Sequence, residues 1–202
     1  MTDLWQIEKQ LFAQGVRLIC GVDEAGRGPL AGPVCAAAVI LPPNLEISGL
    51  NDSKKLSDKK RREFYPIIKQ QAIAYGIAFA DHREIDSVNI LQATYMAMER
   101  AIMQLQIKPD YALIDGNRAK DFGLPVKTVI HGDSLSANIA AASILAKVTR
   151  DDYMERISVD YPQYNFEIHK GYGTKAHYAA LDEFGPSPIH RMSFLKKYYG
   201  NK

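Results

Sequence analysis

The chain has 202 residues, of which 47% are hydrophobic and 24% are charged, and it carries a formal net charge of +2. This composition excludes a disordered chain and fits one globular domain, or a domain with a small appendage, built around one core. The pI near 8.4 does not identify a nucleic-acid binder, because so small a surplus of positive charge can lie anywhere on the surface.

Five segments are predicted to be β-strands, because each is rich in apolar or β-branched residues and is bounded by Gly, Pro, Asp or Asn. The first three leave room for a helix only between the second and the third, which is typical of an antiparallel meander. The last two stand beside helices, as in an α/β arrangement. The five segments are Arg17–Val22, Val34–Leu41, Ile73–Ala80, Tyr111–Ile114 and Val126–Ile130.

Helices are predicted between and after these strands. Serine is a favourable N-cap, and the Lys108-Pro109 step prevents a preceding helix from continuing. The predicted helices run from a Ser57 N-cap to about Gln70, from a Ser87 N-cap to about Gln106, over Ala137–Ile157 and over Thr174–Phe184. A basic, aromatic tail over His190–Tyr199 follows. The fold class is therefore α/β, a mixed five-stranded sheet flanked by helices, with a small C-terminal helical region.

The cysteines and the apolar runs indicate where the protein works. Cys20 and Cys35 both lie in predicted strands, where a buried free thiol behaves as a small hydrophobic group. Residues Met1–Gln10 lack the apolar stretch of a signal peptide, and no run approaches the roughly 20 apolar residues of a membrane span. We expect a cytoplasmic protein without a disulfide, a zinc site or a membrane partner.

Adjacent carboxylates, Asp23 and Glu24, stand at the end of the first strand, inside the glycine-rich segment Gly21–Pro33. Neighbouring residues of a strand point to opposite faces, so both acids can reach one centre only if the strand bends there. Gly26 and Gly28 permit such a bend. A Gly/Pro turn with solvated acids is the alternative, and the glycines and flanking apolar strands reduce its advantage.

Two further acids follow later strands. Asp115 closes the fourth strand and Asp133 follows the fifth, and taken singly they fit an Asp-Gly turn and a loop acid or helix cap. Asp151 rivals Asp133, but a continuous helix separates the two by about 27 Å at 1.5 Å per residue, so only one can join a cluster. The strand-end argument favours Asp133, and Asp151 is interpreted as a solvated residue paired with Arg150 or Arg156.

The combination of these acids predicts a metal site. Groups at the carboxyl ends of neighbouring strands converge on one crevice, and four carboxylates there would repel one another unless cations neutralised them. Oxygen ligands favour Mg²⁺ or Mn²⁺ over zinc. Two such ions about 4 Å apart can activate water and stabilise the leaving oxygen in phosphodiester cleavage.

Several polar groups are candidates for binding a nucleic acid. Ser53 and Lys54 lie in a loop from which both can approach a phosphate, whereas the basic run Lys59–Arg62 is interpreted as a solvated helix face. Tyr172 lies between glycines and can stack on a sugar or base, or else cover the edge of the core. The segment Ser143–Val148 is interpreted as packing surface in which Lys147 is the one polar group of interest.

Recognition of RNA rather than DNA requires hydrogen bonds to the 2′-hydroxyl. The backbone of Gly26, Arg27 and Gly28 can approach a ribose closely, because two of these residues have no side chain.

Five blocks together resemble bacterial ribonuclease HII, and they occur in the family's order over nearly the whole chain. The blocks are Gly21–Pro29, Asp52–Leu56, Ile114–Gly116, Ala141–Asp151 and His169–Tyr172. The resemblance implies a ribonuclease H-like catalytic domain over residues 1–160 and a helical subdomain over residues 161–202 that completes the substrate site.

The resemblance also implies the activity and the roles of single residues. The family cuts the RNA strand of RNA–DNA hybrids and cuts 5′ of single ribonucleotides in duplex DNA, leaving 3′-hydroxyl and 5′-phosphate ends. It implies that Asp23, Glu24, Asp115 and Asp133 hold two Mg²⁺ or Mn²⁺ ions, that Gly26-Arg27-Gly28 reads the 2′-hydroxyl, that Tyr172 stacks on the following deoxyribose and that Lys54 contacts phosphate.

Partners and rival functions remain open from the sequence. Some bacterial members end in a peptide that binds the sliding clamp, but no such peptide is identified in Lys196–Lys202. A monomer is expected. The alternatives are another metal-dependent nuclease on the same fold, which would also cut DNA, and a non-catalytic binding module, which would bind without divalent metal.

Overall fold

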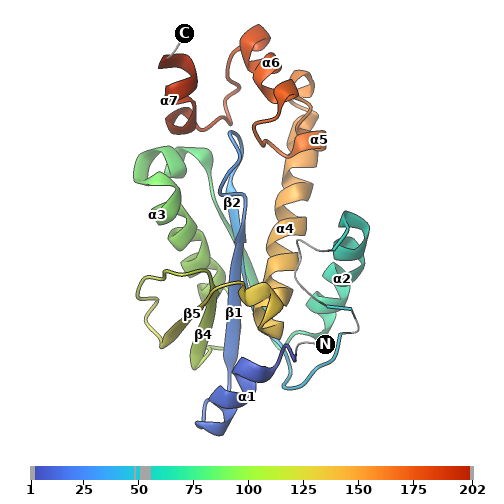
Figure 1. Ribbon diagram of the computed structural model, residues 1–202, viewed down its shortest axis with the longest axis vertical. Helices are drawn as coiled ribbons and strands as arrows, with labels where there is room; N and C mark the ends of the chain where they lie inside the picture. The colour runs from blue at the N-terminus through green and yellow to red at the C-terminus, as the bar shows by residue number, and fades with distance from the viewer. Residues whose placement is uncertain (1–2, 48, 51–55, 201–202) are drawn as a thin grey trace.

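The computed structural model describes residues 3–47, 49–50 and 56–200, which form one mixed sheet between helices (Figure 1). Across the sheet the strand order is β3-β2-β1-β4-β5, in which β1 to β3 are antiparallel and β1, β4 and β5 are parallel. The predicted mixed five-stranded sheet is confirmed, as is its antiparallel first half. The strands are β1 (Ile19–Ala25), β2 (Val34–Ile40), β3 (Ala74–Ala80), β4 (Tyr111–Asp115) and β5 (Val126–Val129).

The predicted helices are present, whereas α1, α5 and α7 were not predicted, α7 lying in the segment described only as a basic, aromatic tail. Ser57 caps α2 as expected, because its Oγ accepts a hydrogen bond from the backbone N–H of Lys60 at 3.3 Å. Short 3₁₀ turns cover Gly132–Ser134 and Pro162–Tyr164. The α-helices of the described segments are α1 (Gln6–Ala13), α2 (Asp58–Gln71), α3 (His82–Met103), α4 (Ala137–Ser158), α5 (Phe166–His169), α6 (Lys175–Phe184) and α7 (Met192–Gly200).

The start of α3 differs from the prediction of a Ser87 N-cap. Asp81 is the N-cap: its side chain accepts from the backbone N–H of Glu84, and the Glu84 side chain accepts from the backbone N–H of Asp81, each at 2.9 Å. The backbone then breaks at Asn89 (φ 71°), whose side-chain oxygen accepts two N–H groups of the next turn. Helical structure therefore begins earlier than predicted and restarts after a kink.

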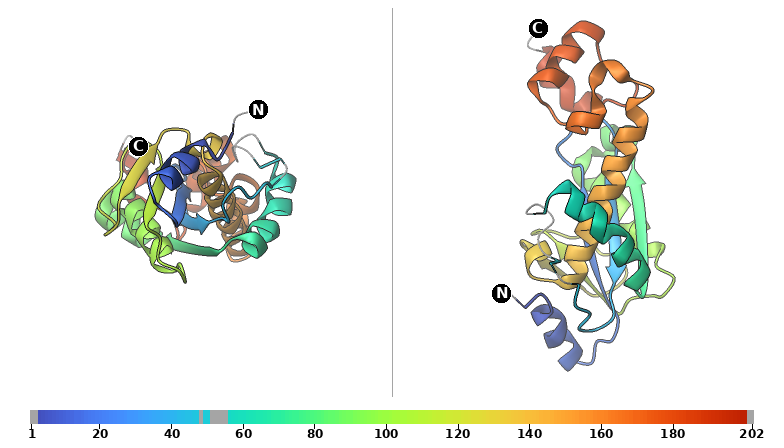
Figure 2. Two further views of the ribbon diagram at one scale, coloured as in Figure 1. Left: turned by 90° about the horizontal axis from the view of Figure 1, so that it is seen from below. Right: turned by 90° about the vertical axis from the view of Figure 1, so that its right-hand side faces the viewer.

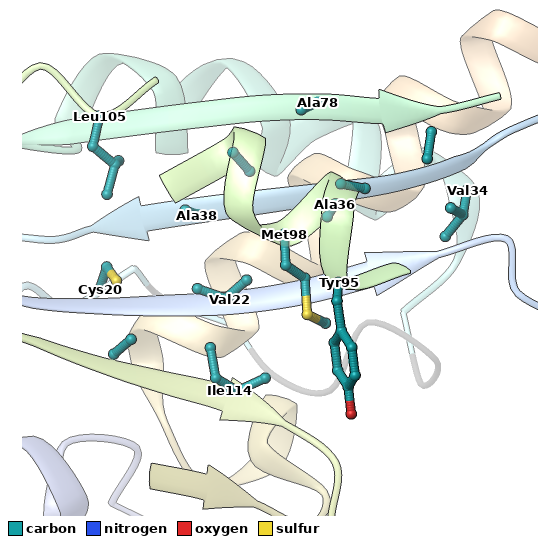
Figure 3. Close-up of a cluster of buried hydrophobic side chains, with 14 of the residues drawn as sticks. Cys20, Val22, Val34, Ala36, Ala38, Ala78, Tyr95, Met98, Leu105 and Ile114 are labelled. Carbon is teal, nitrogen blue, oxygen red and sulfur yellow. The ribbon is translucent and has the colours of Figure 1, made fainter. Parts of the chain in front are cut away.

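Helices cover both faces of the sheet. On one face α3 encloses a cluster that includes Val22, Ala36 and Met98 (Figure 3). On the other face lies α4, with α2 beside it (Figure 2). A Cβ atom on Gly21 would lie only 2.2 Å from the α4 backbone, so the helix rests directly on β1. Because side chains alternate along β1, Asp23 shares the α4 face with Gly21.

The C-terminal helices α5, α6 and α7 form a cap at the end of the sheet where β1 finishes, and α1 lies at the opposite end (Figures 1 and 2). The buried cluster of this cap joins Tyr164 and Phe166 to Leu30, Ala31 and Met154 of the preceding chain. The division of the chain after residue 160 stays a prediction. Within the described segments, no helix combines the length and the apolar character that crossing a bilayer requires.

Candidate active site

A cavity of about 290 Å³ opens at the carboxyl end of β1, beside α4. It brings together residues that are far apart in the chain, which is what convergence at a strand-end crevice predicts. Of the residues predicted for the site, those that line the cavity are Asp23, Glu24, Gly26, Arg27, Gly28, Asp115, Lys147 and Tyr172.

The parallel pairing of β1 with β4 explains why the acids meet. Its last paired residues are Val22 and Ile114, so Asp23 and Asp115 follow next to each other. The backbone N–H of Gly132 donates to Asp115 Oδ1 at 2.7 Å, which ties the turn that carries Asp133 to the end of β4. Contrary to the expectation that the strand must bend at the acid pair, β1 stays paired with β2 through Ala25.

The acids lie within electrostatic range of one another. Asp23 is buried, and its pKa is raised well above the usual value, first by burial and then by the charges of Glu24, Asp115 and Asp133. Asp133 is 1% exposed in its 3₁₀ turn and does not belong to the cavity lining, so it stands behind the other three. The structure thus gathers all four predicted carboxylates.

The donor chemistry of this cluster fits a hard divalent cation, because carboxylates supply only oxygen ligands. Among the residues that the structure describes, however, no three His, Cys, Asp or Glu side chains form a ready metal site. The acids instead hold other partners: Glu24 pairs with Arg27 at 3.3 Å, and Asp23 Oδ1 accepts the backbone N–H of Glu24 at 2.7 Å. Mutual repulsion favours such separate partners until a cation neutralises the cluster.

The interpretation of Asp151 as a solvated residue paired with Arg150 or Arg156 is wrong, both in its exposure and in its partner. Its side chain is 4% exposed and pairs with Lys147, four residues earlier on α4, at 2.9 Å. Because Lys147 lines the cavity, Asp151 reaches the site only through that lysine.

The glycine-rich loop and Tyr172 form one wall of the cavity. Gly26 has φ of 95°, and a Cβ atom there would lie 1.9 Å from Arg150 Nε. At Gly28 a Cβ atom would lie 3.7 Å from the Tyr172 ring. That ring is 42% exposed, with Lys147 Nζ 5.9 Å from its centroid, so it faces the site and does not simply cover the core.

Two polar residues of the cavity lining were not predicted from the sequence. Arg61 was interpreted as part of a solvated face and Ser143 as packing surface, yet both line the cavity. The Arg61 side chain is only 14% exposed. A signal was available, because Arg61 stands three and seven residues before Phe64 and Ile68, the buried residues of α2. Ser53 and Lys54 lie outside the described residues.

Comparison with known proteins places the chain among close sequence relatives. A family model described as Ribonuclease HII matches residues 20–197. The chain is 52% identical over 192 residues to a ribonuclease HII of Caldicellulosiruptor saccharolyticus, covering 95% of this chain and 94% of the relative. It is 56% identical over 179 residues to a ribonuclease HII of Dechloromonas aromatica, covering 89% and 91%.

Solved structures share the fold. The ribonuclease H2 of Pyrococcus horikoshii superposes with a TM-score of 0.74 at 24% identity, covering 92% of this chain and 100% of that one. A ribonuclease HII from Archaeoglobus fulgidus, solved in complex with PCNA, superposes with a TM-score of 0.73 at 25% identity, covering 87% of this chain and 94% of that one. Bst-RNase HIII in complex with Mn²⁺ superposes with a TM-score of 0.64 at 19% identity, covering 83% of this chain and 63% of that one.

Proposed function

Because the chain belongs to the ribonuclease HII family, we propose that it nicks duplex DNA on the 5′ side of a single embedded ribonucleotide, leaving 3′-hydroxyl and 5′-phosphate ends. Membership of this family makes the chain an endoribonuclease that acts on RNA–DNA hybrids. The observation that carries the finer proposal is the cavity in which clustered acids adjoin a glycine-rich backbone loop.

Asp23, Glu24, Asp115 and Asp133 would hold two divalent ions, Mg²⁺ or Mn²⁺, which fits their all-oxygen donor set. Bound ions would activate the attacking water and stabilise the leaving oxygen. The acids would position those ions at the carboxyl ends of β1 and β4. Bound cations would favour the ionised form of Asp23, which its burial beside three other acids opposes. Gly132 keeps Asp115 oriented through its backbone N–H.

The other side of the cavity would recognise the substrate. The backbone of Gly26, Arg27 and Gly28 would read the 2′-hydroxyl, and the exposed ring of Tyr172 would stack on the deoxyribose that follows the ribonucleotide. Lys147 lies beside both, where its ammonium group would contact phosphate. The same role is proposed for Ser53 and Lys54.

The C-terminal region, residues 161–202, would complete this substrate site as a subdomain of the catalytic domain, residues 1–160. It supplies Tyr172, and its buried cluster is continuous with Leu30 and Ala31, just after Gly26–Gly28, the reading loop. A monomer working in the cytoplasm is part of the proposal. A sliding clamp is the protein partner to test, because the Archaeoglobus fulgidus relative was solved with PCNA.

The direct test is a nicking assay on a DNA duplex that carries one ribonucleotide, with Mg²⁺ or Mn²⁺. We expect a single cut on the 5′ side of the ribonucleotide and none in EDTA. An all-DNA duplex of the same sequence is the control substrate. Cleavage of that control would favour a general nuclease, and equal binding with and without metal and no turnover would favour a binding module.

A further inference from the structure

A buried arginine from the C-terminal region lies directly beneath the glycine-rich loop. The Arg191 side chain is 0% exposed. Its Nη2 donates to the carbonyl of Gly26 at 2.6 Å and its Nη1 to the carbonyl of Arg27 at 2.9 Å. Its Nε donates to the carbonyl of Gly32 at 2.9 Å, so a single guanidinium group holds both ends of the loop.

These bonds determine where the N–H groups of the loop point. In a trans peptide the C=O and N–H groups point in opposite directions, and the described chain has no cis peptide bond. The Gly26 carbonyl shares its peptide group with the Arg27 N–H, and the Arg27 carbonyl shares its own with the Gly28 N–H. Both N–H groups therefore point away from Arg191, and neither donates a hydrogen bond within the described structure.

We propose that Arg191 is the positioning residue for ribose recognition: it presents the backbone N–H groups of Arg27 and Gly28 to the 2′-oxygen of the substrate. This inference rests on the proposed function. Arg191 does not touch the substrate and acts through the two peptide groups. Donation to each carbonyl polarises the peptide, which strengthens its N–H as a donor on the opposite side.

The chemistry of arginine suits this role. The rigid guanidinium fork reaches three carbonyls at once, which the single ammonium group of lysine cannot do in the same geometry. Burial lowers the pKa of Arg191 to about 9, and the nearby positive charge of Arg150 adds to that effect. The group is still charged at neutral pH, so the polarisation persists.

Arg150 provides a matched control. It is also 0% exposed and also donates to three carbonyls, but these belong to Ala31, Pro33 and Lys170. Loss of a buried guanidinium fork is therefore common to Arg191→Lys and Arg150→Lys. Loss of the hydrogen bonds to the Gly26 and Arg27 carbonyls occurs only in Arg191→Lys.

The test uses fluorescence anisotropy, with Ca²⁺ present, to measure two dissociation constants. The ratio of interest is the dissociation constant for the all-DNA duplex divided by that for the duplex with one ribonucleotide. Each lost neutral hydrogen bond weakens binding roughly fivefold, so Arg191→Lys should lower the ratio by about tenfold or more. Arg150→Lys also alters a side chain that packs against Gly26, but it removes no hydrogen bond to the Gly26 or Arg27 carbonyl, so it should lower the ratio clearly less than Arg191→Lys does. An equal fall of the ratio in both variants also overturns the inference. A wild-type ratio in folded Arg191→Lys overturns the inference.

A second measurement covers the case in which Arg191→Lys does not fold. In wild-type protein with ¹⁵N-labelled arginine, the NMR signals of the Arg191 side chain should shift on adding the ribonucleotide duplex and not on adding the all-DNA duplex. Identical spectra with both duplexes overturn the inference. If wild-type protein neither nicks the ribonucleotide duplex nor prefers it, the proposed function itself has failed.

Discussion

The acid cluster and the reading loop adjoin in one cavity, yet they are held in place in different ways. Asp23 and Asp115 are placed by the backbone ladder between two parallel strands. Gly26 and Arg27 are placed by a buried side chain 165 and 164 residues later. The comparison suggests that chemistry depends on the sheet and specificity on the C-terminal region, so the two should be separable by mutation.

The largest effect is expected from Asp23→Asn, which removes a ligand charge while nearly preserving shape. A divalent ion contributes several kcal/mol to phosphodiester cleavage, so kcat should fall roughly 1,000-fold or more. Metal-free stability should not fall, because Asp23 is buried beside three other carboxylates. Nicking kinetics and thermal unfolding in EDTA measure these two outcomes.

The control is Asp160→Asn, which changes an exposed carboxylate just after α4. It should leave kcat within about twofold of the wild type. Added Mg²⁺ should raise the melting temperature of wild-type protein more than that of Asp23→Asn, because a ligand that binds only the folded state stabilises it. Wild-type activity in Asp23→Asn would refute the assignment of the acid cluster.

A smaller loss is expected from Asp133→Asn, since this acid stands behind the cavity and has the least effect of the three neighbours on the pKa of Asp23. A loss of roughly 100-fold in kcat would place it among the ligands. Asp151→Asn, which only releases Lys147, should cost less than about tenfold. A reversed order of the two effects would show that the wrong acid was chosen.

The sequence was sufficient for the parts of the molecule that follow local rules. Alternating and apolar runs located all five strands, and acids at strand ends indicated the cluster, because a strand end is visible in the sequence. The break at Asn89 and the Asp81 cap were missed because Ser87, six residues after Asp81, is also a favourable N-cap residue.

Long-range polar contacts were not predictable in this way. Glu8 belongs to a helix of which half the residues are polar, but it is fully buried and accepts a 2.6 Å hydrogen bond from Ser136 at the start of α4. The buried Arg191 likewise sits in a segment that reads as a basic tail. Nothing in the local pattern distinguishes such residues from solvated ones, since their partners are more than 100 residues away.

Tyr172→Ala tests the recognition side of the comparison. Stacking of an aromatic ring on a nucleotide contributes about 1 to 3 kcal/mol, so KM should rise roughly fivefold to 150-fold with a smaller change in kcat. Tyr172→Phe keeps the ring and should stay within about twofold of the wild type. If Tyr172→Ala lowered kcat alone, the ring would serve the chemistry and the proposed division would be wrong.

The smallest effect concerns a buried histidine pair beneath Tyr172. The Ser187 N–H donates to His190 Nδ1 at 2.8 Å, so neutral His190 carries its proton on Nε2. His190 Nε2 therefore donates to His177 Nε2 at an N···N distance of 2.9 Å, which leaves His177 Nδ1 to donate to the Tyr172 carbonyl at 2.9 Å. The pair therefore forms a directed chain of hydrogen bonds that supports the Tyr172 loop only while both rings are neutral.

Burial lowers the pKa of His177 and of His190 to about 4, from an ordinary value of 6.5. Between these values the unfolded chain binds protons that the folded chain does not, so stability is intact above pH 6.5 and falls as the pH drops towards 4. The loss is at most about 1.4 kcal/mol per pH unit for each histidine. Asp23 has a raised pKa and acts in the opposite direction, so only a difference between variants isolates the pair.

His177→Asn retains a side-chain N–H for the Tyr172 carbonyl but cannot titrate. Urea unfolding at pH 7.5, 6.5 and 5.5 should show a shallower loss of stability in this variant than in wild-type protein. His131→Asn, at an exposed position, is the control and should keep the wild-type slope. Equal slopes in wild-type protein and His177→Asn would mean that the buried rings do not resist protonation, and that acid does not act on the Tyr172 loop through them.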